Sequence, residues 1–449
     1  MTADLAARFP TDFRWSTATA AFQVEGARSE GGKGRSIWDE FVETPGRVLD
    51  GSTAEPGPDS YHRIDDDVRL LAELGVDSYR FSISWVRVQP DGQGPANPDG
   101  LDYYRRLVDA LLEAGITPFP TLYHWDLPIT LHREGGWLNR AIAERFADYT
   151  QLVAAALGDR VTDWYTLNEP VSTTLEGYAI GELAPGEALL FDALPTVHHQ
   201  LLAHGRAVPI LRAHGAERIG IVNNHTHVRP LHDTADDHRA VDAYDLIHNR
   251  LFADPLLTGR YPDLEAFGLP PMPVRSDDLA VISAPCDFYG VNFYNPTTVT
   301  APPADSPIPF DLSATRGAEH TGFGEMWPIV PGALTALLVD FRDRYGPSLP
   351  PIVIGENGAS FPEPATVEGT IDDRNRIHYL AGHVAAVADA IAAGVDVREY
   401  TVWSLLDNFE WAAGFSQRFG IVHVDQTTGT RTPKASYAWY RDLIAQARV

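Results

Sequence analysis

Short apolar runs alternate along the chain with longer segments in which apolar residues recur at the helical period. In one longer segment Val68, Leu71 and Leu74 lie near that period, and a glycine follows as a stop signal. Helices that end at a glycine are predicted at residues 65–75, 100–115, 139–158 and 376–394, and a last helix at residues 435–449. The short runs predict strands at residues 13–20, 76–85, 116–125, 161–170, 218–225, 286–294, 351–357 and 397–408.

The order of these elements predicts the fold class. Strands that are mostly separated by helices indicate repeated βα units and hence a parallel sheet. Eight such units with a last helix at the C-terminal end favour an α/β fold of the (β/α)₈ type, the TIM barrel. A doubly wound open sheet is the alternative. No linker interrupts the pattern, so we expect a single barrel domain over residues 1–449.

Two loops are long for this pattern, residues 44–60 and residues 295–325. The second is rich in Pro, Gly and Ser and exceeds an ordinary connector in length. Loops of this kind are usually disordered or line a binding site. We therefore expect elaborated loops at the C-terminal face of the strands.

The charge balance of the chain argues against several function classes. Lys and Arg number 35 against 61 Asp and Glu, which gives a formal net charge of −26. Nucleic-acid binding needs clustered cations, and an anionic membrane surface repels so acidic a chain. We expect neither partner, and we interpret the excess charge as favouring solubility.

Cys286 is the only cysteine, which excludes a disulfide within the chain and a thiolate metal site. The first residues lack the basic stretch and apolar core of a signal peptide. No run reaches the roughly 18 apolar residues of a membrane span. We therefore expect a cytoplasmic protein, and nothing in the pattern decides between a monomer and a homo-oligomer.

The residues at the C-terminal ends of the predicted strands are candidates for a site, because barrel active sites lie at that face. They are carboxylates, amides, an imidazole, a phenol and indole rings. Aromatic faces stack on the C–H faces of sugar rings and polar groups bind hydroxyls, so the set predicts a carbohydrate pocket. Its members are Gln23, Glu25, His124, Trp125, Asn168, Glu169, Asn292, Tyr294, Glu356, Trp403, Glu410 and Trp411.

Two glutamates of this set each stand beside an asparagine, in TLNEP and IGENG. Hydrolysis of a glycosidic bond needs one carboxylic acid to protonate the leaving oxygen and one carboxylate to attack the anomeric carbon or activate water. A single glutamate at a strand end is more often a solvated residue where the chain leaves the sheet than a catalytic residue. Strands four and seven face each other across a barrel mouth, so Glu169 and Glu356 together favour catalysis.

At these motifs the chain resembles glycoside hydrolase family 1, the β-glucosidase family. The resemblance covers nearly the whole chain and is carried by FRWSTATAAFQVEGA, GRSIWDEF, YRFSISW, TLYHWDLP, WYTLNEP, GVNFYN, IGENGA and WSLLDNFEWAAGFSQRFGIVHVD. It implies a retaining mechanism on a (β/α)₈ barrel, with Glu169 as acid/base and Glu356 as nucleophile. The two carboxyl groups supply the proton transfers and the nucleophile, so we expect no cofactor and no metal.

The resemblance also implies supporting roles around the two glutamates. Arg80 and Tyr294 match positions that hold the nucleophile. Burial and the charge of Glu356 should keep Glu169 protonated near neutral pH. Residues that match contacts to the sugar are Gln23, His124, Asn168, Trp403, Glu410 and Trp411, and the strand ends add Trp125 and Asn292 as candidates.

Some positions depart from the family's pattern. Trp327 matches the platform for the leaving group, but Met326 and Pro328 flank it where members usually have Gly and Glu. Gly355 stands where many members have Thr, and we expect it to alter local packing. We expect Gly358 to let the chain turn away from the strand.

Retained residues argue against two branches of the family. Glu169 is not replaced by the Gln of myrosinase-like members, and NFEW around Glu410 lacks the phosphate site of phospho-glycosidases. We therefore predict an O-glycosidase that releases terminal β-D-glucosyl residues from small or oligomeric β-glucosides, as in cellulose degradation. We expect β-galactosides and β-fucosides as side substrates. The alternatives are a transglycosidase with the same intermediate and a non-catalytic sugar-binding barrel.

Overall fold

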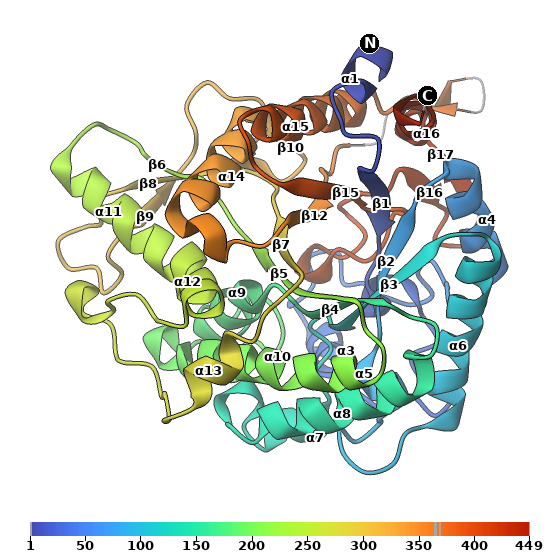
Figure 1. Cartoon of the computed structure of the whole chain (residues 1–449), viewed down its shortest axis with the longest axis horizontal. Coiled ribbons are helices and arrows are strands. Elements are labelled where there is room, and N and C mark those ends of the chain that lie inside the picture. The colour runs from blue at the N-terminus through green and yellow to red at the C-terminus, as the bar shows by residue number, and fades with distance from the viewer. Residues whose placement is uncertain (1, 363–365, 368–369, 449) are drawn as a thin grey trace.

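The computed structural model describes residues 2–362, 366–367 and 370–448. Within this part of the chain eight parallel strands form a closed barrel, and long helices surround it (Figure 1). The barrel strands are β1 (Arg14–Ala18), β2 (Ser78–Ser82), β3 (Thr117–Tyr123), β4 (Asp163–Asn168), β5 (Arg218–Asn224), β7 (Phe288–Asn292), β12 (Ile352–Asn357) and β15 (Val397–Trp403).

The barrel closes at β1, which pairs in parallel with β15 on one side and with β2 on the other. The other strands pair in the order β15-β12-β7-β5-β4-β3-β2. Each predicted strand segment contains one of these strands. The predicted TIM barrel is therefore confirmed, and the doubly wound alternative is wrong.

The long helices form the outer layer. In α4 the side chains of Val68, Leu71 and Leu74 are buried, as their spacing predicts. Gly75 ends this helix in the left-handed conformation, with a φ of 79°. The long helices are α4 (Ile64–Leu74), α6 (Pro98–Glu113), α8 (Ile142–Leu157), α10 (Pro195–Ala213), α14 (Gly332–Tyr345), α15 (Arg374–Ala392) and α16 (Ala435–Ala447). No helix in the described residues is long and apolar enough to cross a membrane.

Shorter elements elaborate the connections. The shorter helices are α1 (Thr2–Ala6), α2 (Ala21–Val24), α3 (Ile37–Glu43), α5 (Trp85–Val88), α7 (Ile129–Arg133), α9 (Pro170–Ser172), α11 (Ala235–Asp245), α12 (Leu251–Thr258) and α13 (Asp278–Ile282). The shorter strands are β6 (Val228–Pro230), β8 (Thr297–Thr300), β9 (Asp311–Ser313), β10 (His320–Thr321), β11 (Gly324–Pro328), β13 (Thr366–Val367), β14 (Thr370–Ile371), β16 (Val422–Val424) and β17 (Arg431–Pro433). Segment 295–325 is thus built into small sheets, because β8 pairs with β6 and β9, and β10 pairs with β11.

The barrel interior is filled by a cluster of aromatic and branched side chains, which we call the plug. Phe119, Tyr165 and Phe288 pack on one another, with the ring centroids of Phe119 and Tyr165 4.3 Å apart. Val222 and Val353 complete the plug. As in other barrels of this type the centre is a packed core and not a pore, so ligands meet the barrel at its ends.

Candidate active site

A cavity of about 310 Å³ lies at the carboxyl ends of the barrel strands, and we call it the main cavity. It brings together most of the residues that the strand ends predict. Those that line it are His124, Trp125, Asn168, Glu169, Tyr294, Trp327, Glu356, Trp403, Glu410 and Trp411. Gln23, Arg80 and Asn292 lie directly behind the lining, within hydrogen-bond distance of it.

Glu356 lies near the end of β12 and is held at both carboxylate oxygens. The Nη1 atom of Arg80, from β2, donates to Oε1 over 2.6 Å, and the Tyr294 hydroxyl donates to Oε2 over 2.5 Å. Arg80 and Glu356 are 1% and 3% exposed, so their ion pair is shielded from water. Burial and the charge of Glu356 raise the pKa of Tyr294, so this phenol keeps the proton that it donates. Charge-assisted bonds of this kind fix one orientation of the carboxylate.

Glu169 follows β4 and precedes the proline that opens α9. Its Oε1 accepts a hydrogen bond from Asn292 over 2.7 Å, and its Oε2 accepts one from Ser172 over 2.9 Å. Burial, followed by the negative charge of Glu356, raises the pKa of Glu169 to about 8 despite these two donors. The group therefore holds a proton at neutral pH, as the sequence predicts for a general acid.

A network of amides connects the two glutamates. The Oδ1 atom of Asn168 accepts from Arg80 over 2.6 Å and from Asn292 over 3.1 Å, so its Nδ2 faces the Nε2 atom of His124 at 3.0 Å. Because an amide nitrogen only donates, Nε2 of His124 must accept. Burial and the charge of Arg80 hold the pKa of His124 well below its usual range. The neutral ring thus carries its proton on Nδ1, where it can donate to a ligand hydroxyl.

Glu410 and Gln23 form the polar end of the main cavity. Gln23 donates from Nε2 to the Phe409 carbonyl over 2.8 Å and to Oε2 of Glu410 over 3.4 Å. Its Oε1 atom is buried and has no partner among the described residues. Burial, followed by the charges of Glu356 and Glu169, raises the pKa of Glu410 to about 8. Both side chains can therefore exchange hydrogen bonds with hydroxyl groups.

Aromatic rings form two walls of the main cavity. Trp403 and Trp411 both stack on His124, with ring centroids 5.8 Å and 5.9 Å away. On the other wall Trp327 stacks on Phe323, with ring centroids 4.5 Å apart. The first wall stands beside Glu410, and the second belongs to the long segment 295–325 and the strand β11 after it.

Backbone strain accompanies this constellation. Trp125, Glu169 and Trp411 have φ values of 78°, 44° and 47°, in the left-handed region that side chains other than glycine rarely adopt. Such residues cost about 1–3 kcal/mol each and persist where the surroundings fix them. One fixing contact is the hydrogen bond from Nε1 of Trp125 to the Asn168 carbonyl, 3.0 Å long.

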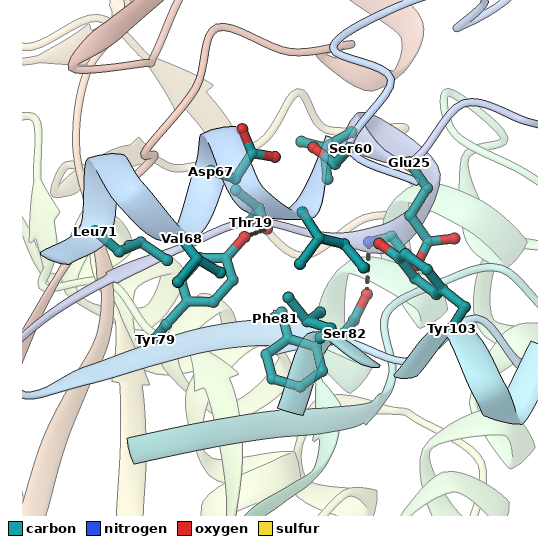
Figure 2. A pocket seen from close by; sticks show the side chains of 14 residues that line it. Thr19, Glu25, Ser60, Asp67, Val68, Leu71, Tyr79, Phe81, Ser82 and Tyr103 are labelled. Atoms are coloured by element: carbon teal, nitrogen blue, oxygen red, sulfur yellow. Dashed lines mark hydrogen bonds between the residues drawn. The ribbon is translucent and has the colours of Figure 1, made fainter. Parts of the chain in front are cut away.

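Glu25 does not join the main cavity, so its assignment to the pocket is wrong. It lies beside a different cavity, of about 20 Å³, near Tyr103 and Ser82 (Figure 2). Its carboxylate accepts hydrogen bonds from Arg87 over 2.8 Å and from Tyr104 over 2.7 Å. The helix α2, which begins three residues after β1, turns the chain before Glu25 is reached and directs it into this buried ion pair.

Two glycines beside Glu356 serve close packing. A Cβ atom on Gly358 would lie 1.8 Å from the Trp403 carbonyl oxygen, and its φ is not positive. Gly358, the first residue after β12, therefore lets the chain pass close to the end of β15, and its expected role in turning the chain away stays a prediction. A Cβ atom on Gly355 would lie 2.7 Å from Val222 and 2.8 Å from the side-chain oxygen of Asn292. Gly355 thus leaves room for Asn292, the donor to Glu169.

Residues that the strand ends do not predict also line the main cavity. Ser172 and Glu176 follow Glu169 at spacings of three and seven, which place side chains on one face of a helix. That spacing could have identified them. Phe323 and Phe419 reach the cavity from loops; only the length of segment 295–325 signalled a lining role, and nothing in the local pattern marks Phe419.

Known proteins resemble the chain over nearly its full length. The profile of "Glycosyl hydrolase family 1" matches residues 5–449. "Beta-glucosidase A" of Thermotoga maritima is 42% identical over 441 residues, which are 97% of this chain and 98% of that protein. A "Bifunctional beta-D-glucosidase/beta-D-fucosidase" of Bifidobacterium breve is 44% identical over 463 residues, 97% of this chain and 98% of that protein.

A solved structure agrees with this likeness. The psychrophilic β-glucosidase of Micrococcus antarcticus has a TM-score of 0.94 and 44% sequence identity, and the match covers 100% of this chain and 99% of that one. The sequence motifs, the closed barrel and these relatives all lead to one assignment. The chain belongs to glycosyl hydrolase family 1.

Proposed function

We propose that the chain is a retaining β-glucosidase that acts as one catalytic domain and releases terminal β-D-glucosyl residues by double displacement. The observation that carries the proposal is the contrast between two buried glutamates. Glu356 pairs with Arg80, whereas Glu169 holds a proton at neutral pH because its pKa is about 8. The names of the relatives from Thermotoga maritima and Bifidobacterium breve support the glucoside specificity and add β-fucosides as a side substrate.

In the first step an oxygen of Glu356 attacks the anomeric carbon of the bound glucoside. The bond between that carbon and the leaving oxygen breaks, and Glu169 transfers its proton to the leaving oxygen. The products are an alcohol and a glucosyl ester of Glu356. Arg80 and Tyr294 hold the attacking carboxylate in place, which lowers the entropy cost of reaching the reactive geometry.

In the second step Glu169 acts as a base, because formation of the ester changes the charge beside it. The ester has removed the negative charge of Glu356, which is the second largest cause of the raised pKa of Glu169. Glu169 is then ionised, takes a proton from water, and the resulting oxygen attacks the anomeric carbon as Glu356 departs. Two inversions give net retention of the β configuration.

The remaining residues would bind the two halves of the substrate. We assign the sugar hydroxyls to Gln23, His124, Asn168 and Glu410, whose free donors and acceptors face the polar end of the main cavity. Trp403 and Trp411 would stack on the sugar ring, Trp125 and Asn292 would support the residues that hold it, and Trp327 would stack on the leaving group.

Proton NMR of the first-formed sugar tests the stereochemistry, because the β anomer must appear before mutarotation. Azide rescue separates the two roles. With an aryl β-glucoside that has a good leaving group, Glu356→Ala plus azide should give the α-glucosyl azide, and Glu169→Ala plus azide the β-glucosyl azide. An α anomer as the first hydrolysis product, or azides of the opposite configuration, would overturn the assignment.

A further inference from the structure

A series of buried hydrogen bonds connects the outer helix α15 with the segment that carries Glu356, and neither displacement step makes use of it. The series begins at Tyr400 on β15, whose hydroxyl donates to Oδ1 of Asn357 over 2.6 Å. Asn357 is the last residue of β12 and follows Glu356 directly. Because Oδ1 accepts this bond, the amide of Asn357 presents its donor atom, Nδ2, in the other direction.

Tyr379 continues the series from α15. The Nδ2 atom of Asn357 donates to the Tyr379 hydroxyl over 3.2 Å and to the Phe293 carbonyl over 2.6 Å. The Tyr379 oxygen therefore accepts, and its own proton is donated to the Tyr294 carbonyl over 2.7 Å. Burial raises the pKa of Tyr379, so the phenol keeps this proton. Successive bonds that run in one direction polarise and strengthen one another in a buried environment.

The last bond of the series matters because Tyr294 lies beyond the end of β7, where the sheet no longer holds the main chain. Its carbonyl is held by Tyr379, and Phe293 before it donates from its backbone nitrogen to the Glu356 carbonyl over 3.0 Å. The Tyr294 hydroxyl in turn donates to Oε2 of Glu356 over 2.5 Å. The bonds thus form a closed circuit, which leaves the nucleophile segment at Asn357 and returns to it at Glu356.

The ring of Tyr379 is held as firmly as its hydroxyl. It stacks on His383, four residues later in α15, with ring centroids 3.9 Å apart. The Nδ1 atom of His383 donates to the Tyr379 carbonyl over 2.8 Å, since a carbonyl only accepts. Burial lowers the pKa of His383 to about 4, so this ring is neutral. Both side chains are fully buried, and the Tyr379 hydroxyl therefore fixes the position of the Tyr294 carbonyl.

We propose that Tyr379 is a positioning residue for the reaction: it fixes the main chain of Tyr294, and thereby the hydroxyl that orients the carboxylate of Glu356. The inference rests on the proposed function, because it takes Glu356 as the group that attacks the anomeric carbon. A displacement of about 1 Å in a reacting group can cost on the order of 100-fold in rate. A residue of the outer helix layer thus contributes to the rate without touching the substrate.

Trapping of the nucleophile measures the step in which Tyr379 acts. 2,4-Dinitrophenyl 2-deoxy-2-fluoro-β-D-glucoside should form an ester with Glu356 and lose dinitrophenolate, a leaving group that needs no proton from Glu169. The first-order rate constant of inactivation reports the attack, and the inhibition constant reports binding. Tyr379→Phe removes only the hydroxyl. It should lower the rate constant about tenfold and change the inhibition constant by less than about twofold.

Tyr437→Phe is the matched control, because it also removes a buried phenolic hydroxyl. Tyr437 is on α16 and donates to the Leu70 carbonyl on α4 over 2.6 Å. Both variants should lower the midpoint of urea unfolding to a similar extent, since each loses buried hydrogen bonds. Only Tyr379→Phe should slow the attack. If Tyr437→Phe slows it equally, the effect is a general loss of stability and the inference is wrong.

A double variant tests whether Tyr379 acts through Tyr294. In a Tyr294→Phe background the hydroxyl that orients Glu356 is already gone. Adding Tyr379→Phe should then lower the rate constant of inactivation by less than about twofold further, because the two effects follow one route. A further tenfold loss in the double variant would show that Tyr379 acts by another route, and would overturn the inference.

Tyr400→Phe is an independent variant that leaves Tyr379 itself intact and decides the question if Tyr379→Phe yields little folded protein. It removes the bond that aims the amide of Asn357 at Tyr379. The rate constant of inactivation should fall about threefold, with the inhibition constant unchanged. An unchanged rate constant in this variant would contradict the proposed series of bonds.

The outcomes separate the inference from the proposed function. If folded Tyr379→Phe is inactivated as fast as the unmodified chain, the inference fails and the glucosidase proposal stands. The mass of the peptide that contains Glu356 shows whether the ester has formed. If the unmodified chain forms no ester there, the glucosidase proposal fails and this inference fails with it.

Discussion

The barrel buries carboxylates at both ends of its plug, and the two clusters differ in their balance of charge. At the amino ends of the strands, Asp163 lies 2.8 Å from Arg14 and 2.6 Å from Arg218, and both arginines also face Glu399 within 3.6 Å. Two guanidinium groups thus face two carboxylates. Burial raises the pKa of Asp163 to about 6 against the attraction of Arg14, which still leaves it ionised at neutral pH.

The cluster at the carboxyl ends is short of positive charge. Glu356 pairs with Arg80, but Glu169 and Glu410 have no such partner among the described residues. Burial and mutual repulsion raise the pKa of each to about 8, on the other side of neutrality. Burial is common to both clusters, so it does not by itself make a carboxyl group reactive. The missing cation leaves a proton available for transfer.

Glu356→Ala should have the largest effect on activity. Loss of the nucleophile should lower kcat for phenyl β-glucoside on the order of 10⁵-fold or more. The free energy of unfolding should change little, because Arg80 keeps its bonds to the Gly355 carbonyl and to Asn168, and Glu169 ionises more readily once the charge of Glu356 is gone. Steady-state kinetics measure the loss in kcat, and urea unfolding measures the free energy of unfolding. A large loss of stability would mean that this cluster, like the other, is structural.

Asp163→Ala should show the opposite pattern. It leaves two partly buried guanidinium groups facing Glu399 alone, which should cost about 3 kcal/mol of the free energy of unfolding. The kcat of the folded fraction should change less than twofold. Asp159→Ala, at an exposed ion pair with Arg160, is the control and should cost about 0.5 kcal/mol or less. Urea unfolding measures both losses of stability. An inactive but stable Asp163→Ala variant would contradict a structural role for the cluster at the amino ends of the strands.

Ser172→Ala should give the smallest effect, a change in pH dependence. The Ser172 hydroxyl stabilises the ionised form of Glu169, so its removal should raise the pKa of Glu169 further above the present value of about 8. The first step needs the protonated acid, so activity is present below this pKa and lost above it. The basic limb of the kcat/KM profile should therefore move to higher pH, with a few-fold loss in kcat.

Ser172→Thr keeps the hydroxyl and is the control for this shift. Its basic limb should stay where the unmodified chain has it. A limb that moves to lower pH in Ser172→Ala would show that the hydroxyl does not stabilise the carboxylate, and that its bond to Glu169 serves packing.

The repeated βα pattern was enough to predict the barrel and the convergence of its strand ends. Each apolar run is short and bounded, and several of the long helices end at or next to a glycine such as Gly75, so local signals and global fold agree. Glu169 and Glu356 could be predicted to meet because strand ends share one face. Their protonation states followed from the same reasoning, since burial and repulsion act in any such pair.

Contacts set by tertiary structure could not be predicted. Glu25 follows the same strand as Gln23, but the short helix α2 sends it to Arg87, far away in sequence. Phe323 and Phe419 reach the main cavity through loops whose course has no periodic signal. A side chain at Gly358 would collide with the carbonyl of Trp403 on the neighbouring strand β15. A single sequence does not show which strands approach most closely.

The pairing of β1 with β15 has a consequence for the synthesis of the chain. Residues 14–18 emerge early from the ribosome, but their second neighbour is complete only when Trp403 has been added. Until then β1 and β12 each carry an open edge, and open edges recruit strands from other chains. A premature stop before β15 should therefore yield aggregates and no weakly active enzyme, and shielding by a chaperone would matter most in the last stage of translation.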